Sequence, residues 1–298
     1  MRKSTPYFVA NAFAPRPFAG NPAGVFPCAD ELTTSQMQAI AKQLNLVETV
    51  FVSSPQTEGV DFEVRYFTPE KELPLAGHPT IAAWHILATQ GFLPNEARSV
   101  FRQHTPKGIQ EIKLERTGQQ IRVVMQQEQP QFYGIYEDKA GVAEVFSLEE
   151  GDLLEAYPVE SVDTGLGHII FGVKDLASLM KVRRNIGPLK KLCTSMQASE
   201  AQIFCSETYD PSLTLHTRNI CPREGMEDPA CGVGNSALLA YLMKNGFFKS
   251  NESEMLAEQG HIEDRPSVIY VKGRKTPDSY ELELGGSAIT MSKGEFLL

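Results

Sequence analysis

The sequence predicts an α+β protein of two pseudo-symmetric domains, each a barrel-like mixed β-sheet around a central apolar helix. Three observations lead to this prediction: the chain length, an internal repeat, and one apolar helix in each repeat. With 298 residues, the chain is long enough for two domains of about 150 residues, each with its own core. Hydrophobic residues make up 42% and charged residues 22%, which is typical of a globular chain rather than a disordered or fibrous one.

The two halves of the chain resemble each other around a strand–loop–helix unit. Two pairs of identical residues are each 153 positions apart: Arg65/Arg218 and Phe51/Phe204. Further along, AGHPTIAAWHILATQGFL (76–93) aligns with CGVGNSALLAYLMKNGFF (231–248) after a two-residue insertion in the second loop. Two amphipathic segments can resemble each other by chance, but a common spacing over such long separations favours a duplication.

The apolar pattern predicts the elements of each half. Residues 79–90 and 235–245 are apolar on almost every side and each stops before a glycine, so both are predicted to be enclosed helices. An amphipathic helix is predicted over 33–44. Strand patterns lie at 47–53, 60–67, 109–115 and 119–126. The acidic, loosely helical stretch 134–158 is expected to link the two halves.

Charge and cysteine content restrict the partners and the compartment. A net charge of −9 argues against a nucleic-acid partner, which would require clustered Lys and Arg. No apolar run approaches the roughly 18 residues that span a bilayer, so no membrane association is expected. Five cysteines without a CxxC pair, and without a secretory signal, predict a reduced cytoplasmic protein with no zinc site. Four histidines show no ligand spacing: His104, His168, His216 and His261. His85 lies on the apolar helix and is expected to be a core or rim residue.

Each enclosed helix is expected to begin at a glycine-containing loop, residues 76–79 in the first half and 228–234 in the second. Free backbone N–H groups at a helix start form an anion site, and we expect the two loops to face each other across a cleft. Four titratable residues fall in or beside these loops: Glu48, His78, Asp228 and Cys231. This combination suits removal of a proton α to a carboxylate, which needs a base and electrostatic help but no metal or organic cofactor.

Four segments carry a resemblance to a known family: AFAPRPFAGNPAGV (12–25), NLVETVFV (45–52), RYFTPEKELPLAGHPT (65–80) and EDPACGVGNSALLAYL (227–242). They resemble the phenazine-biosynthesis PhzF-like family, which has the diaminopimelate-epimerase-like fold. The similarity includes the closing segment GGSAITMSKGEFL (285–297), which in the family returns to the first domain. The first domain is therefore expected to comprise residues 1–128 and 286–298, and the second residues 129–285.

The resemblance implies roles for individual residues. The family's proton-shuttling glutamate falls on Glu48, its active-site histidine on His78 and its aspartate on Asp228. The loop glycines whose amides hold a substrate carboxylate fall on Gly77 and Gly232. The resemblance also implies a cofactor-free enzyme, usually a homodimer, that acts on a small carboxylate-bearing metabolite.

Three positions depart from the family pattern. Val47, Cys231 and Val233 stand where the family has serine, threonine and serine. Fewer hydroxyl donors make the phenazine precursor a doubtful substrate, although Val233 is still expected to line the substrate site. The Cys231 loop resembles the second catalytic cysteine loop of diaminopimelate epimerase and proline racemase. Its counterpart in the other half is Ala76, so a two-cysteine racemase is incomplete here.

These observations leave three functions open. The leading hypothesis is a cofactor-independent isomerase that shifts a proton on a small carboxylate-bearing substrate, with Glu48 as the acid/base. The second is an amino- or hydroxy-acid epimerase that uses Cys231, with Glu48 or His78 as the opposing base. The third is a non-catalytic dimeric binding protein that retains the pocket. Cys231 fits either a thiolate activated by the helix start or a small packing residue.

Overall fold

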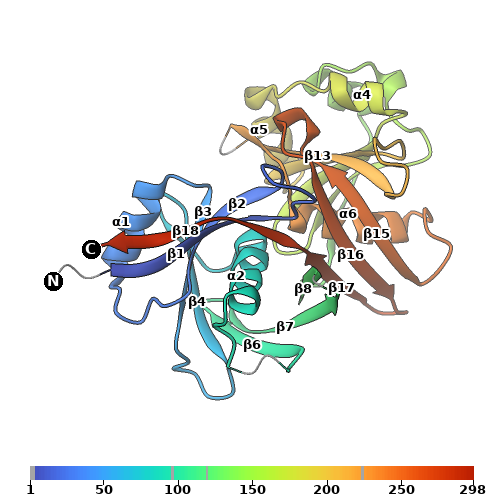
Figure 1. Cartoon of the computed structure of the whole chain (residues 1–298). Helices are drawn as coiled ribbons and strands as arrows, with labels where there is room; N and C mark the ends of the chain where they lie inside the picture. The colour runs from blue at the N-terminus through green and yellow to red at the C-terminus, as the bar shows by residue number, and fades with distance from the viewer. Residues whose placement is uncertain (1–3, 95–96, 119, 223–224) are drawn as a thin grey trace. The chain divides into compact units, whose positions relative to one another are not determined.

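The computed structural model describes residues 4–94, 97–118, 120–222 and 225–298, and the chain divides into two compact units (Figure 1). Unit 1 comprises Met1–Gln126 and Gly285–Leu298, and unit 2 comprises Gln127–Leu284. Among the described residues, no helix is long and apolar enough to cross a membrane.

Unit 1 is built on a mixed sheet. Its strands are β1 (Ser4–Ala12), β2 (Asn21–Phe26), β3 (Glu48–Ser53), β4 (Phe62–Phe67), β5 (Glu72–Leu73), β6 (Val100–Thr105), β7 (Gly108–Thr117), β8 (Gln120–Gln126) and β18 (Ala288–Leu297). They pair in the order β18, β1, β2, β3, β4, β6, β7, β8, with β5 beside β4. The β2–β3 and β4–β6 pairs are parallel and the others are antiparallel.

The sheet of unit 1 encloses helix α2 (Gly77–Thr89) (Figure 1). This helix contacts β18 and β8, the two ends of the strand order, as well as β1, β2 and β3. The four successive residues 81–84 point to all sides of the helix, and all four are fully buried, because strands surround it. Helix α1 (Thr34–Leu44) lies outside the sheet and packs Met37 and Ile40 into a separate aromatic cluster.

Unit 2 repeats this arrangement. Its strands are β9 (Gln131–Tyr136), β10 (Val159–Asp163), β11 (Gly167–Gly172), β12 (Glu200–Cys205), β13 (Leu215–Cys221), β14 (Met226–Asp228), β15 (Glu252–Gln259), β16 (Ser267–Lys275) and β17 (Tyr280–Gly286, ending in unit 1). The order β9, β10, β11, β12, β13, β15, β16 again contains two parallel pairs, β11–β12 and β13–β15. Helix α6 (Gly232–Lys244) contacts β10, β11, β12, β15 and β16 and is buried along nearly its whole length.

The two units share their chain path, which confirms the predicted fold class. Each contains a parallel strand pair joined through outer helices: α1 in unit 1, α4 (Leu176–Lys181) and α5 (Ile186–Ser195) in unit 2. Each then has a short strand before its enclosed helix. The register differs from the sequence alignment in one detail: Arg65 faces Phe51, whereas Arg218 faces Ile203 and not Phe204. Glu48 and Glu200, the first residues of β3 and β12, are therefore equivalent positions.

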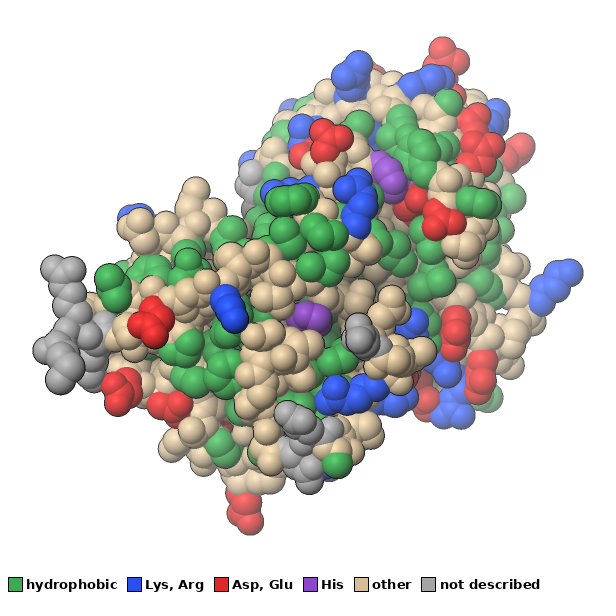
Figure 2. All heavy atoms as spheres, in the orientation of Figure 1, with side chains coloured by type: hydrophobic (Ala, Val, Ile, Leu, Met, Phe, Trp, Pro, Cys, Tyr) green, Lys and Arg blue, Asp and Glu red, His purple; other side chains and the backbone are tan. Residues whose placement is uncertain are grey.

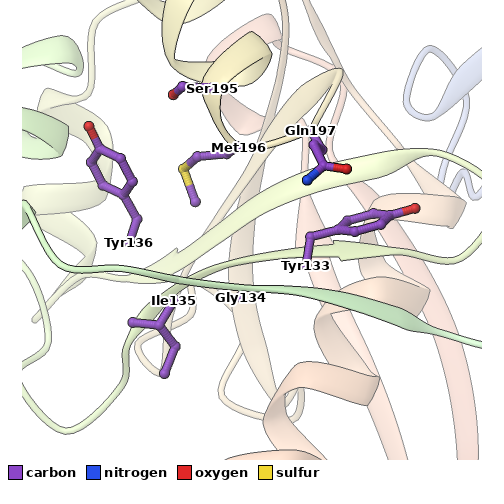
Figure 3. Close-up of a pocket in the computed structure, with 7 residues that line it drawn as sticks. All are labelled: Tyr133, Gly134, Ile135, Tyr136, Ser195, Met196 and Gln197. Atoms are coloured by element: carbon purple, nitrogen blue, oxygen red, sulfur yellow. The ribbon is translucent and has the colours of Figure 1, made fainter.

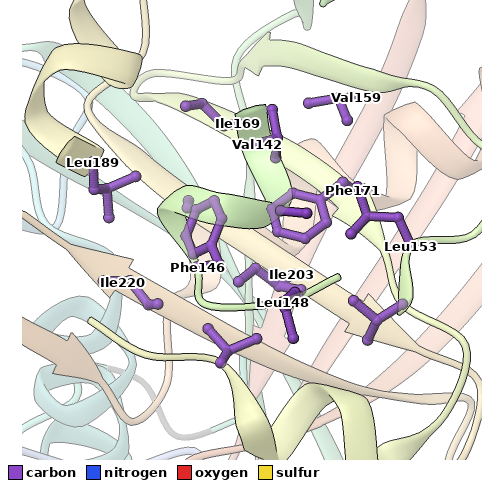
Figure 4. Close-up of a cluster of buried hydrophobic side chains, with 14 of the residues drawn as sticks. Val142, Phe146, Leu148, Leu153, Val159, Ile169, Phe171, Leu189, Ile203 and Ile220 are labelled. Carbon is purple, nitrogen blue, oxygen red and sulfur yellow. The ribbon is translucent and has the colours of Figure 1, made fainter. Parts of the chain in front are cut away.

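The prediction that residues 134–158 link the two halves is wrong. Most of this stretch belongs to the fold of unit 2, as the end of β9, helix α3 (Lys139–Val145) and the short 3₁₀ helix η1 (Glu150–Asp152). Val142 and Phe146 are fully buried in the hydrophobic cluster drawn in Figure 4. The acidic residues that suggested a linker form the outer side of α3 and η1, while apolar residues between them face inward. Both enclosed helices also begin earlier than predicted, because the loop glycines form part of their first turns.

Because Phe146 is buried in the core of unit 2, shortening its side chain should destabilise the protein. Phe146→Ala is expected to lower the free energy of unfolding by about 3–5 kcal/mol, because it leaves a cavity in a closely packed cluster. Ile135→Ala, in the same stretch but 55% exposed, is the matched control and is expected to change it by less than about 1 kcal/mol. Urea unfolding at equilibrium measures both. Equally small effects would mean that this stretch is a linker after all.

Candidate functional site

In unit 1, the structure brings together two of the predicted site residues. Glu48 begins β3 and His78 is the second residue of α2, and Oε2 of Glu48 lies 3.5 Å from Nδ1 of His78. The side chains of Glu48 and His78 are 16% and 8% exposed. Glu48 also lies opposite Ala23 on β2, within the GNPAGV segment. The pair therefore lies where the start of a strand meets the start of the enclosed helix.

The Glu48–His78 contact is not an ion pair at neutral pH. Burial lowers the pKa of His78 to about 3, although a hydrogen bond with the backbone of Pro22 opposes the shift. A neutral imidazole leaves the neighbouring carboxylate without a compensating positive charge from His78. His78 is thus a neutral neighbour of the Glu48 carboxyl and not its counter-ion.

The start of α2 lacks a side-chain cap among the described residues. Its N-cap residue, Ala76, has no polar side chain, and none of the described side chains caps this helix end. The helix therefore presents the backbone N–H groups of Gly77 and His78 and the positive end of its dipole. Pro79 adds no N–H but favours the helical conformation of the first turn.

In unit 2, Asp228 lies at the end of β14, just before α6. Its carboxylate accepts a hydrogen bond of 2.7 Å from the N–H of Ala230, and its carbonyl accepts one of 2.7 Å from Nε2 of Gln259. Burial raises the pKa of Asp228 to about 7, and the negative charges of Glu200 and Glu227 add to the effect. Asp228 can therefore gain and lose a proton near neutral pH, as a general acid or base requires.

Cys231 is the N-cap of α6, and its Sγ accepts a hydrogen bond of 3.3 Å from the N–H of Gly234. Sγ also lies 3.7 Å from Nε2 of His168 and 3.9 Å from Oε2 of Glu200. Sequence spacing missed these two neighbours, because β11 and β12 carry them from far along the chain. A correct alignment of the two halves would have pointed to Glu200, because it places Glu200 at the position equivalent to Glu48.

The other residues of the two loops have packing constraints. A Cβ on Gly232 would lie 2.4 Å from Cδ2 of Leu284, so a larger residue there would have to displace the Leu284 side chain. The carbonyl of Val233 accepts a hydrogen bond of 3.2 Å from Oγ1 of Thr164. Val47, the third departure from the family pattern, is 40% exposed.

Two groups of donor atoms in unit 2 have the composition of metal ligands, which histidine spacing did not predict. They are His168/Glu200/Cys231 and His216/Glu258/His261, each with its donor atoms within 4.8 Å of one another. The carboxylate of Glu258 also accepts hydrogen bonds from the backbone N–H groups of Tyr209 and Asp210. Glu258 therefore has a clear structural role in holding that loop.

Unit 2 also has a surface pocket of about 90 Å³, shown in Figure 3. It is lined by Tyr133, Gly134, Ile135, Tyr136, Ser195, Met196 and Gln197, none of which is a predicted site residue. Its volume is well below the roughly 300 Å³ of an ordinary small-molecule site. Figure 2 shows basic and acidic side chains interspersed over the visible surface.

The fold and these groups define the class of protein: an epimerase-like fold with buried titratable residues at the starts of its enclosed helices. The chain belongs to the phenazine biosynthesis-like protein family, whose profile matches residues 10–294. It is 33% identical over 294 residues to an uncharacterized isomerase of Clostridium acetobutylicum, covering 97% of this chain and 96% of that protein. It is 28% identical over 298 residues to trans-2,3-dihydro-3-hydroxyanthranilate isomerase of Pseudomonas chlororaphis, covering 98% and 99%.

Solved structures agree with this assignment. A PhzF-family protein of Bacillus anthracis has a TM-score of 0.91 and 28% identity, covering 99% of this chain and 100% of that one. A hydroxyproline epimerase of Agrobacterium vitis, with bound trans-4-hydroxy-L-proline, has a TM-score of 0.66 at 13% identity, covering 100% and 94%. At that identity it supports the fold alone. The protein is an isomerase of the PhzF-like family.

The two shifted groups predict opposite pH dependences of stability. Asp228 has a raised pKa, so between about pH 4 and 7 the folded chain holds a proton that the unfolded chain has lost, and stability falls as pH rises. His78 has a lowered pKa, so between about pH 6.5 and 3 the unfolded chain gains a proton that the folded chain refuses, and stability falls as pH falls. Each contributes a slope of up to about 1.4 kcal/mol per pH unit, with opposite signs.

Between pH 4.5 and 6.5, Asp228→Asn is therefore expected to shift the slope of the free energy of unfolding against pH upward. His78→Gln is expected to shift the same slope downward. The double variant is expected to return the slope toward that of the unsubstituted protein. Urea unfolding at several pH values measures these slopes. Unchanged slopes in both single variants would contradict the protonation states given above.

Proposed function

We propose that this protein is a cofactor-independent isomerase that shifts a proton on a small carboxylate-bearing substrate, with Glu48 as the acid/base. The observation that carries the proposal is the pairing of Glu48 with His78, held neutral by burial, beside the uncapped start of α2. Family membership supports the reaction class, because the relatives are named isomerases.

In this proposal, the amides of Gly77 and His78 bind the substrate carboxylate. The positive end of the helix dipole then stabilises the enolate-like charge that develops when the adjacent carbon loses its proton. Glu48 removes that proton, keeps it as the protonated acid and returns it to another carbon. A protonated His78 would make Glu48 a weaker base through ion pairing, so a neutral imidazole at this position favours the reaction.

The substrate class is a small carboxylate, and the particular compound differs between relatives. The Pseudomonas chlororaphis relative acts, by its name, on trans-2,3-dihydro-3-hydroxyanthranilate, which makes that compound the first to assay. Val47, Cys231 and Val233 replace hydroxyl side chains of the family pattern with less polar groups. We therefore expect a less hydroxylated or smaller substrate to be preferred.

A second candidate, an amino- or hydroxy-acid epimerase that uses Cys231, is favoured by the position of this thiol next to His168 and Glu200. The third, a non-catalytic binding protein, predicts ligand binding without proton exchange.

The proposal also includes a cytoplasmic location and, from the family resemblance, a homodimer. Analytical ultracentrifugation tests the dimer.

Glu48→Gln is expected to lower kcat/KM by about 10²- to 10⁴-fold, the usual contribution of a general acid/base, with little change in ligand affinity. The substrate is incubated with enzyme in D₂O, and NMR follows the incorporation of deuterium at carbon. The unsubstituted protein should incorporate deuterium and the Gln variant should not.

Glu63→Gln is the matched control for this experiment. Oε2 of Glu63 lies 2.6 Å from Nδ1 of His104, so the variant breaks another Glu–His contact of unit 1, away from α2. It is expected to keep near-normal exchange. Exchange at the normal rate in Glu48→Gln would remove Glu48 from the mechanism, and exchange lost in both variants would indicate a general structural effect.

A further inference from the structure

Unit 2 contains a buried group of three side chains that the reaction proposed for Glu48 does not use: His168, Glu200 and Cys231. They come from β11, β12 and the start of α6, and one donor atom of each lies within 4.8 Å of the others. We propose that these residues form a zinc site, in which Nε2 of His168, Oε2 of Glu200 and Sγ of Cys231 bind one Zn²⁺ ion and water takes the fourth position. The site belongs to unit 2 alone and takes no part in the proton shift proposed for Glu48.

The spacing of the three donor atoms matches that of tetrahedral zinc ligands. Zinc bonds of about 2.0–2.1 Å to nitrogen and oxygen and about 2.3 Å to sulfur place N and O about 3.4 Å apart and S about 3.6 Å from either. Here Nε2 of His168 lies 3.2 Å from Oε2 of Glu200 and 3.7 Å from Sγ of Cys231, and the Sγ–Oε2 distance is 3.9 Å. Each separation is within about 0.3 Å of the expected one, so an ion fits after small side-chain movements.

The second ring nitrogen of His168 fixes the orientation of the first. Nδ1 lies 2.8 Å from the carbonyl oxygen of Leu166, and a carbonyl only accepts, so Nδ1 carries the hydrogen. In the neutral ring, Nε2 then carries the lone pair, and it lies beside the carboxylate of Glu200 and Sγ of Cys231. A metal-bound histidine typically donates its other N–H to a carbonyl or carboxylate in this way, which holds the ring in place.

The start of α6 holds the third ligand. Cys231 is the N-cap residue, and the N–H of Gly234 donates a hydrogen bond of 3.3 Å to its Sγ. This contact orients the thiolate, as outer hydrogen bonds do for the ligands of a metal ion. A Cβ on Gly234 would lie 3.0 Å from Nε2 of His168, so the glycine leaves room beside that nitrogen.

The charges of the ligands balance the charge of the ion. A thiolate on Cys231 and a carboxylate on Glu200 together carry two negative charges, which one Zn²⁺ neutralises. Cys231, Glu200 and His168 are 7%, 5% and 0% exposed, so this neutrality matters, because an uncompensated charge at such a buried place is costly. A thiolate together with an imidazole also selects Zn²⁺ over Mg²⁺ and Ca²⁺, which prefer oxygen ligands.

The other group of unit 2 with the composition of metal ligands fits an ion less well. Nδ1 of His216 lies 2.7 Å from Oε2 of Glu258, a hydrogen-bond distance that is too short for two ligands of a tetrahedral ion. The two oxygens of Glu258 also accept hydrogen bonds from the backbone N–H groups of Tyr209 and Asp210. This group therefore provides a matched control variant, His261→Gln, in which a histidine of the less suitable group is changed.

The bound ion has a consequence for the thiol. It connects the start of α6 to β11 and β12, and it occupies Sγ of Cys231. A thiolate that is a zinc ligand is not available as a base, so the zinc-bound protein is incompatible with the epimerase that uses Cys231. The proton shift at Glu48 in unit 1 does not depend on the ion, and failure of either proposal leaves the other standing.

The first test is zinc binding by the folded protein. The protein is stripped with a chelator and titrated with Zn²⁺, and the bound metal is measured by elemental mass spectrometry after dialysis. One zinc per chain is expected in the unsubstituted protein and in His261→Gln. Cys231→Ser and His168→Gln should lose at least about a hundredfold in zinc affinity, more than the loss of an outer hydrogen bond costs. Zinc bound equally well by these two variants, or lost in His261→Gln, would overturn the proposal.

The second test identifies the ligands in the unsubstituted protein, and it does not require that a ligand variant folds. Co²⁺ replaces zinc, and one equivalent should produce a thiolate-to-cobalt charge-transfer band in the near ultraviolet and the intense visible bands of four-coordinate Co²⁺. Cys193→Ser, which changes another buried thiol of unit 2, should retain the charge-transfer band. The weak visible bands of six-coordinate Co²⁺ without a charge-transfer band, or loss of that band in Cys193→Ser, would contradict the site.

Discussion

The enclosure of one apolar helix in each unit is the constraint on which the rest of this structure depends. Helices α2 and α6 have no polar face, so strands must surround them to remove their side chains from water. Enclosure also fixes where polar chemistry can occur, because side chains of the helix body contact the sheet. The first turn, where backbone N–H groups have no carbonyl partner within the helix, is the part of each helix that can serve a ligand.

The same frame supports different protonation states in the two units. In unit 1, burial removes the charge of His78 and leaves Glu48 as the ionisable partner. In unit 2, burial raises the pKa of Asp228 to about 7, and Nε2 of His168 lies 3.2 Å from Glu200 and 3.7 Å from Cys231. One physical cause, desolvation, thus disfavours a positive charge on His78 and a negative charge on Asp228. The duplicated scaffold contributes the positions, and single residues decide the chemistry.

The sequence predicted the fold class, the duplication and the helix over 33–44, because apolar periodicity and repeated motifs are local signals. It assigned 134–158 wrongly, because acidic residues on the outer side of α3 and η1 hid the buried Val142 and Phe146. His168 and Glu200 were missed for another reason. Their meeting with Cys231 depends on the register of β11 against β12, and the aligned pair Phe51/Phe204 was displaced by one residue from the true register.

The most direct test of the central claim is a crystal structure of the protein with trans-2,3-dihydro-3-hydroxyanthranilate or a close carboxylate analogue bound. The account predicts that the ligand carboxylate accepts hydrogen bonds from the backbone N–H groups at the start of α2. A ligand carbon should lie within about 3.5 Å of the carboxylate of Glu48, as a reacting pair requires. A ligand bound away from both enclosed helices, for example in the pocket lined by Tyr133 and Met196, would contradict it.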